Sequence, residues 1–337
     1  MAALDPSYRF LACQYLREQL DILMRELHGV RRNDDVEPVH QARVASRRVR
    51  AALDMFADCF KTKKAANWPK RIKKLTRELG AARDKDVQIE FVEQFLAALD
   101  EKDKKNRPGV ERLLLRLRQA REALQSEVIT TLDKLEKADT LAEMYGEMEK
   151  TLFSLRSHGT PLSSLFVLQA TRAHIGDKKE GLMACARSLD DPEDARGHHQ
   201  MRIAAKKLRY TLEISDRAYE GRLEDSIAAF KQVQSLLGDV HDCDVWVQSI
   251  DGLLEQERLA TVKYFGHSQP FNRLKPGLLL VCEDRAQHRR QVFGELLECW
   301  NGLDADHFWN ALEDVLEQQD VRIDAEKDED KENRPAQ

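Results

Sequence analysis

Two stretches of the chain repeat one unusual pattern of histidine and basic residues. One reads HQARVASRRVR from His40, and the other reads HQMRIAAKKLR from His199, 159 residues later. Neither contains a helix breaker, and at 100° per residue the basic side chains fall on one side of a helix and the apolar ones on the other. Like charges on one helix face repel each other. The repeat therefore predicts two helices with an apolar back and a basic front that suits an anion.

A second marker follows each stretch at nearly the same distance. The first half has LGAARDKDV from Leu79 and the second has LGDVHDCDV from Leu237, and the glycine comes 40 and 39 residues after the histidine. Two markers that keep their separation predict an internal duplication. We interpret this marker as a helix–Gly–helix corner, in which Gly80 and Gly238 end one helix and the aspartates open the next.

The composition favours long helices with few turns. Of 337 residues, 34% are charged, 15 are Gly and 9 are Pro, and we find no strand-forming run and no Gly-rich phosphate loop. We predict an all-α fold of two tandem helical bundles, related by a pseudo-twofold axis around a basic central cleft. The expected boundaries are 1–157 for the first repeat, 158–318 for the second and 319–337 for an acidic, disordered tail.

Targeting signals and cysteine usage point to the cytoplasm. No run of 18 apolar residues occurs, and the start of the chain lacks a charged-then-apolar leader. The six cysteines are scattered without a CxxC pair, which favours reduced thiols over disulfides or zinc. We therefore expect a cytoplasmic protein with no membrane partner.

The net charge of −5 conceals a strongly basic segment. Residues 40–86 hold 14 Lys and Arg against 5 Asp and Glu. Besides the first motif, this segment contains a helix predicted near residues 65–79, whose basic front is formed by Lys70, Lys73, Lys74 and Arg77. A segregated basic patch indicates an anionic partner.

Each half contains His-x-x-Arg with a trailing basic cluster, followed by Leu-Gly-x3-Asp-x-Asp-Val. This doubled pattern resembles the CHAD family (conserved histidine α-helical domain), and the resemblance covers roughly residues 7–318. The resemblance implies two four-helix-type bundles and a basic channel that binds inorganic polyphosphate. It also implies association with polyphosphate granules or with polyphosphate-metabolising enzymes. The implied ligand contacts are His40, Arg43, Arg47, Arg48, Arg50 and Lys73 in the first half, and His199, Arg202, Lys206, Lys207, Arg209 and Lys231 in the second.

The second half departs from the first on the helix that follows the motif. Lys231 matches Lys73, but Gln232 and Ser235 stand where the first half has Lys74 and Arg77. We therefore expect a lopsided site that is stronger on the first half. The ExExK signature of triphosphate tunnel enzymes is absent from this sequence, and we expect binding without catalysis, cofactor or metal.

Two other functions use the same residues. The basic fronts could bind the backbone of RNA, although they offer only Tyr210 for base stacking. His241-Asp242 resembles the doublet of metal-dependent phosphohydrolases, with His198 or His199 as a further ligand. The first half has Arg83 in the slot of His241, and arginine is a poor metal ligand, which argues against this alternative. A purely structural scaffold is the remaining interpretation.

Overall fold

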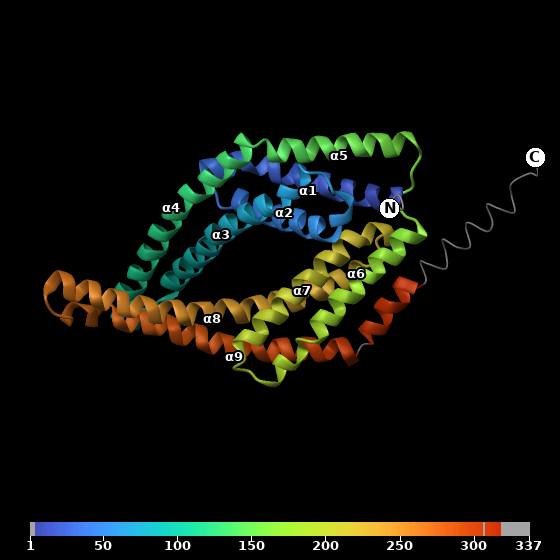
Figure 1. Cartoon of the computed structure of the whole chain (residues 1–337). Helices are drawn as coiled ribbons and strands as arrows, with labels where there is room; N and C mark the ends of the chain where they lie inside the picture. Colours follow the sequence, from blue (N-terminus) through green and yellow to red (C-terminus); the bar gives the residue numbers. More distant parts are fainter. Residues whose placement is uncertain (1–3, 306, 318–337) are drawn as a thin grey trace, which may run out of the picture.

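The computed structural model describes residues 4–305 and 307–317, and in this part of the chain it is helical with no strand, which confirms the predicted all-α class (Figure 1). The last described residues, 308–317, are also helical. The predicted tail, 319–337, lies outside the described residues. The principal helices are α1 (Pro6–Arg32), α2 (Glu37–Met55), α3 (Trp68–Ala98), α4 (Arg107–Lys137), α5 (Thr140–Ser157), α6 (Leu165–Met183), α7 (Ala195–Ser215), α8 (Glu224–Phe265) and α9 (Lys275–Ala305).

Side-chain caps explain where several helices begin. The Asp5 carboxylate accepts a hydrogen bond from the Tyr8 backbone N–H at 3.0 Å, and Pro6 occupies the first helical position, as the sequence predicts. The sequence predicts that Pro161 opens the first helix of the second half and that Asp191-Pro192 leads to its motif helix. Both helices begin slightly later, because Ser164 caps α6 and Asp194 caps α7.

The predicted corners at Gly80 and Gly238 are wrong. Both glycines lie inside unbroken helices, α3 and α8, so the aspartates that follow them are interior residues and not helix openers. Glycine inside a helix costs only about 1 kcal/mol relative to alanine. The neighbouring Leu79 and Leu237 are fully buried, and this packing is sufficient to carry each helix through its glycine.

The sequence also predicts that Gly29 ends the first helix, and this prediction is wrong for a similar reason. Gly29 belongs to α1, which runs on to Arg32 and ends at Asn33 in the left-handed conformation (φ 54°). A Cβ at Gly29 would lie 2.6 Å from the Pro38 side chain. The glycine therefore serves the close approach of α2 to α1.

Helices in equivalent positions of the two halves contact each other. α1 packs on α6, α2 on α7 and α4 on α9. The pseudo-twofold relation between the halves stays a prediction. The predicted boundary after residue 157 falls at the end of α5. The division into two domains stays a prediction, because one hydrophobic cluster contains buried residues from both halves.

A close crossing between the halves uses a repeated Pro-Gly pair. α4 begins with Pro108-Gly109 and α9 with Pro276-Gly277. A Cβ on Gly109 would lie 2.8 Å from the Cα of Gly277, and a Cβ on Gly277 would lie 2.9 Å from the Cα of Gly109. The two backbones thus touch at a point where only glycine fits. This pair is a third marker of the duplication, and it was visible in the sequence.

Candidate functional site

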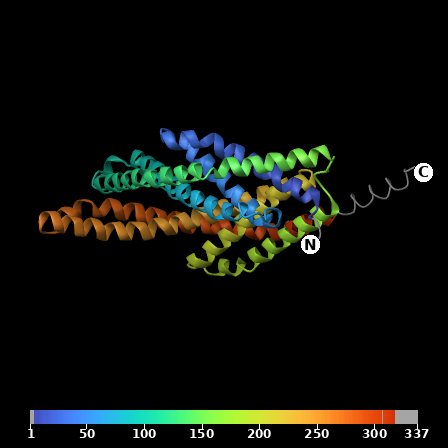
Figure 2. The same ribbon diagram turned by 45° about the horizontal axis from the view of Figure 1, so that its top comes forward.

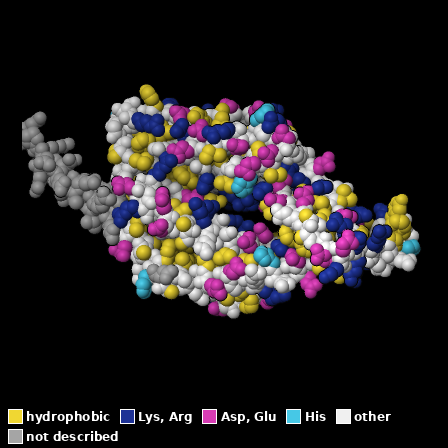
Figure 3. Space-filling view, turned by 180° about the vertical axis from the view of Figure 1, so that it is seen from behind, with side chains coloured by type: hydrophobic (Ala, Val, Ile, Leu, Met, Phe, Trp, Pro, Cys, Tyr) yellow, Lys and Arg dark blue, Asp and Glu magenta, His cyan; other side chains and the backbone are white. Residues whose placement is uncertain are grey.

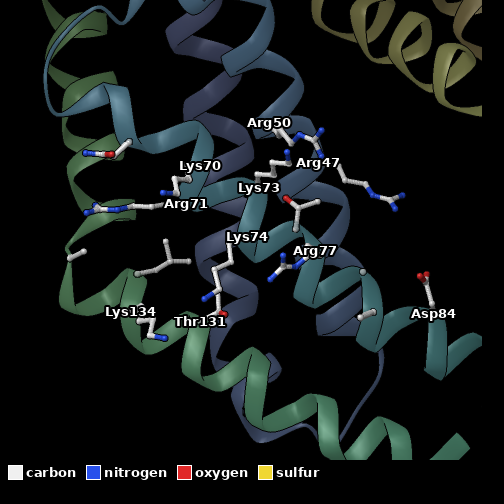
Figure 4. Close-up of a pocket in the computed structure, with 16 residues that line it drawn as sticks. Arg47, Arg50, Lys70, Arg71, Lys73, Lys74, Arg77, Asp84, Thr131 and Lys134 are labelled. Atoms are coloured by element: carbon white, nitrogen blue, oxygen red, sulfur yellow. The ribbon is translucent and has the colours of Figure 1, made fainter.

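A basic pocket of about 1090 Å³ opens between α2, α3 and α4 (Figure 4). Lysine and arginine side chains from all three helices line it. Six of them belong to the predicted set, whereas Arg71 on α3 and Lys134 on α4 were not foreseen, because nothing in the sequence singles them out from the many other charged residues of their helices. The basic residues of this pocket are Arg47, Arg50, Lys70, Arg71, Lys73, Lys74, Arg77 and Lys134.

Most cations of the basic pocket lack a carboxylate partner. Within the part of the chain that the structure describes, the four exposed residues Arg50, Lys70, Lys73 and Lys74 form no ion pair within 4 Å. Arg77 is paired with Glu78 at 2.6 Å. Among the described residues that line the pocket, Asp84 is the only carboxylate and none is aromatic. The pocket is therefore a site of concentrated positive potential with no stacking platform.

A second group of cations lies where the two motif helices meet. This central cluster consists of Arg43 and Arg47 on α2 and Arg202 and Lys206 on α7, and α2 packs against α7. Burial, and then the charges of Arg202, Arg47 and Arg43, lower the pKa of Lys206 to about 7. Seen from behind, Lys and Arg side chains gather around a hollow in the middle of the molecule (Figure 3). The two halves thus bring their basic fronts together.

The repeat marker around Gly80 and Gly238 holds the motif arginine in place. The guanidinium of Arg43 lies against Gly80, where an added Cβ would be 3.8 Å from its Nε, and it pairs with Asp84 at 3.0 Å. Arg202 repeats this with Gly238 at 3.9 Å and Asp242 at 3.9 Å. Each side chain is only 15–16% exposed. Glycine and aspartate one helical turn apart therefore form a cradle for a guanidinium.

The second aspartate of each marker ties the motif helix to its neighbours. Asp86 accepts a hydrogen bond from Arg121 of α4 at 2.6 Å, and Arg121 also donates to Asn33, just before α2, at 2.5 Å. In the second half, Asp244 pairs with Arg289 of α9 at 2.5 Å. Arg289 also donates to the carbonyl of Pro192, before α7. These buried pairs position the start of each motif helix.

Several predicted contacts lie elsewhere. Arg48 and Arg209 both bind the buried carboxylate of Glu213, at 3.1 Å and 2.6 Å, so one of their two positive charges is compensated within the interface between α2 and α7. Lys207 and Lys231 are exposed and do not line the basic pocket.

The two motif histidines have equivalent neighbours. His199 Nδ1 lies 3.3 Å from His241 Nδ1, and the rings are 4.4 Å apart. Burial first, and then the charge of Arg202, lower the pKa of both residues, that of His241 to about 4. In the first half, burial and then Arg83 lower the pKa of His40. Near pH 7 these imidazoles are therefore neutral hydrogen-bonding groups and not cations.

His198 faces away from the doublet of the phosphohydrolase alternative. It is fully buried, its Nε2 lies 2.9 Å from the carbonyl oxygen of Ser188, and its ring contacts Phe293. Across residues 4–305 and 307–317, no group of three or more His, Cys, Asp or Glu side chains is arranged to hold a metal ion.

No helix in the described ranges combines the length and the apolar character needed to cross a bilayer. The six cysteines, all within these ranges, form no disulfide with one another.

Fold and site together define an all-helical protein with an internal sequence repeat and a cation-lined pocket. The family model of the CHAD domain matches residues 14–251, and the chain belongs to this family. The crystal structure of the CHAD domain from the plant Ricinus communis is similar to it, with 24% identity, 94% of each chain covered and a TM-score of 0.53. PptA from Streptomyces chartreusis is similar as well, with 16% identity, 86% of this chain and 98% of that chain covered and a TM-score of 0.54. At these identities the two structures establish the fold. No curated protein sequence matches the chain significantly.

Proposed function

We propose that this protein binds inorganic polyphosphate without catalysing a reaction on it. The ligand is a linear anion with about one negative charge per phosphate, so it needs a row of cations. The observation that carries the proposal is the convergence of Arg50, Lys70, Lys73 and Lys74 on one pocket without carboxylate partners in the described chain. Arg47 lies in both the basic pocket and the central cluster and so connects them.

Polyphosphate suits this pocket better than nucleic acid. Binding of single-stranded RNA or DNA without sequence preference relies on aromatic side chains that stack on bases. Asn67, Thr76, Thr131 and aliphatic groups complete the pocket lining, and they offer hydrogen bonds but no ring. Membership of the CHAD family agrees with the polyphosphate binding that the sequence resemblance implies.

A long polyphosphate chain exceeds the pocket and leaves phosphates free for other molecules. We therefore extend the proposal to a cytoplasmic protein that associates with polyphosphate granules or with polyphosphate-metabolising enzymes. Fluorescence co-localisation with stained granules tests this extension, and uniform fluorescence in granule-containing cells would contradict it.

Titration calorimetry with long-chain polyphosphate tests the binding. We expect Lys70→Ala/Lys74→Ala to weaken binding at least about tenfold, because each lysine contributes a charge-assisted hydrogen bond. By analogy with nucleic-acid binding, the affinity falls steeply with salt as counterions are released.

The matched control is Lys102→Ala/Lys105→Ala, which removes two exposed lysines from the loop between α3 and α4, outside the basic pocket. It changes the net charge equally and should leave binding nearly intact. Equal losses in both variants would reduce the interaction to general charge attraction. RNA that displaces polyphosphate at equal phosphate concentration would favour the nucleic-acid alternative.

A further inference from the structure

The hairpin of α8 and α9 extends beyond the rest of the molecule. Ten more residues separate Gly238 from Gly277 than separate the equivalent Gly80 from Gly109. Glu257 of α8 is held by Arg112 and Arg116 of α4, and Gly277 of α9 contacts Gly109. Residues 258–276, which we term the distal arm, continue past these contacts and project from the body in two views (Figures 1 and 2).

Two aromatic residues are exposed at the end of the distal arm. Tyr264 is 83% exposed and Phe265 is 54% exposed, whereas Phe271 of the same arm is buried. Their rings are 4.8 Å apart and meet edge to face at 77°. Gly266 follows at φ 77° and ends α8 directly after the pair. Water therefore contacts most of the Tyr264 side chain and about half of the Phe265 side chain, which is unfavourable for apolar groups unless a partner covers them.

The distal arm is positively charged throughout. No Asp or Glu occurs between residues 258 and 282. Lys263, Arg273 and Lys275 are exposed, as is His267, and no carboxylate in the described chain pairs with any of these three cations. The view from behind shows apolar, basic and histidine side chains together at the tip of the arm (Figure 3).

The equivalent hairpin of the first half has neither property. Its loop, between α3 and α4, contains Asp100, Glu101 and Asp103 among its lysines, and it has no aromatic residue. The combination of exposed rings and uniform positive charge is therefore particular to the α8–α9 hairpin and is not a consequence of the duplicated fold.

We infer that the distal arm is a contact surface for membranes that contain anionic phospholipids. Aromatic rings are favourable at the headgroup level of a bilayer, and lysine and arginine beside them are attracted to anionic headgroups. The planar surface of a bilayer can accommodate the small convex tip of the distal arm. Stable protein partners bury about 800 Å² on each side, which two rings do not offer. Nucleic-acid bases stack on flat ring faces, and the edge-to-face pair offers no continuous platform for them.

This contact differs from a membrane span, for which the chain has no candidate helix among its described residues. The arm would rest on the surface of the bilayer and leave the basic pocket free. Such a contact departs from the expectation of no membrane partner, which rests on the lack of a spanning segment and a leader and does not concern surface contact. It extends the function beyond the proposed polyphosphate binding, and neither inference depends on the other.

Co-sedimentation with vesicles tests the inference. We expect the full chain to bind vesicles of equal parts phosphatidylcholine and phosphatidylglycerol, and to bind pure phosphatidylcholine much less. Tyr264→Ser/Phe265→Ser should reduce partitioning at least about tenfold, because two apolar side chains lose their burial. Phe153→Ser is the matched control, since Phe153 on α5 is 76% exposed but lies outside the arm. It should bind like the wild type.

Saturating long-chain polyphosphate in the same assay separates the arm from the basic pocket. Binding that persists with the pocket occupied, and that still requires Tyr264 and Phe265, supports the inference. Binding that polyphosphate abolishes, or that the double serine variant retains, overturns it. Failure of the wild type to bind anionic vesicles overturns it as well. A lower sedimentation coefficient of the serine variant without vesicles would instead indicate that a second copy covers the rings, which also contradicts the membrane contact.

Discussion

The pKa of Lys206 is lowered by burial first and then by the surrounding cations. Arg202 of its own helix and Arg43 and Arg47 of the other half act on it, and together with burial they lower its pKa to about 7, so it can gain a proton near neutral pH. A polyanion bound nearby favours the protonated form and raises this pKa. Binding and proton uptake are therefore coupled at Lys206.

We predict that polyphosphate binding takes up protons at pH 8. Between the free pKa near 7 and the higher bound pKa, affinity should rise as the pH falls, and below pH 7 this contribution should level off. Calorimetry in buffers of different ionisation enthalpy measures the uptake. Lys206→Arg keeps the charge permanently and should lower the uptake, whereas unchanged uptake in this variant would assign it to other groups.

The aspartates of the repeat marker show how one residue pattern carries a tertiary role. Asp84 and Asp242 hold the motif arginines, and Asp86 holds Arg121. The marker was recognised from the sequence as a repeat, but its interpretation as a corner was wrong. The partners of these aspartates come from other helices, 35 to 45 positions away, and no local pattern reveals them.

At the scale of whole helices, the crossing of α4 and α9 depends on the absence of two side chains. Gly109 and Gly277 contact each other through their backbones, and α1–α6 and α2–α7 are the other contacts between equivalent helices. A side chain at this crossing would separate α4 from α9 and disturb the cluster that contains Leu278 and Trp246.

We predict that Gly109→Ala destabilises the fold by at least about 2 kcal/mol, because the new methyl group meets backbone and cannot be accommodated by a rotamer change. Gly146→Ala is the control. Its Cβ has open space on α5, and it should stabilise the protein by up to about 1 kcal/mol through helix propensity. Urea denaturation measures both. Similar stability of the two variants would mean that the crossing is not tightly packed.

The whole molecule presents its cations asymmetrically. The basic pocket belongs to the first half, with residues of α2, α3 and α4, while Arg202 and Lys206 of the second half reach only the central cluster. In the second half, Gln232 and Ser235 replace two of the pocket cations. A short anion would fill the pocket, whereas a long chain would extend from it into the central cluster.

We predict that chain length decides which cations matter. Lys70→Ala/Lys74→Ala should weaken binding of both tripolyphosphate and long-chain polyphosphate. Arg202→Ala/Lys206→Ala should weaken long-chain binding at least about tenfold while changing tripolyphosphate binding by less than about threefold. Titration of the two ligands into each variant measures this. Equal effects of the second variant on both lengths would place the short ligand in the central cluster instead.

The sequence by itself determined the helical class, the duplication and the two basic helix faces, because these depend on periodicity and spacing along one chain. Only the tertiary structure decided which cations are available to bind an anionic ligand. Arg48 and Arg209 carry the same charge as Arg50, but both are paired with Glu213, which offsets one of their two charges, and Lys134 reaches the pocket from a helix that no motif marks. Charge compensation and pocket membership arise from contacts between helices distant in sequence. Helix continuity through Gly80 has the same origin, because burial of the apolar face of α3 outweighs the local cost of one glycine.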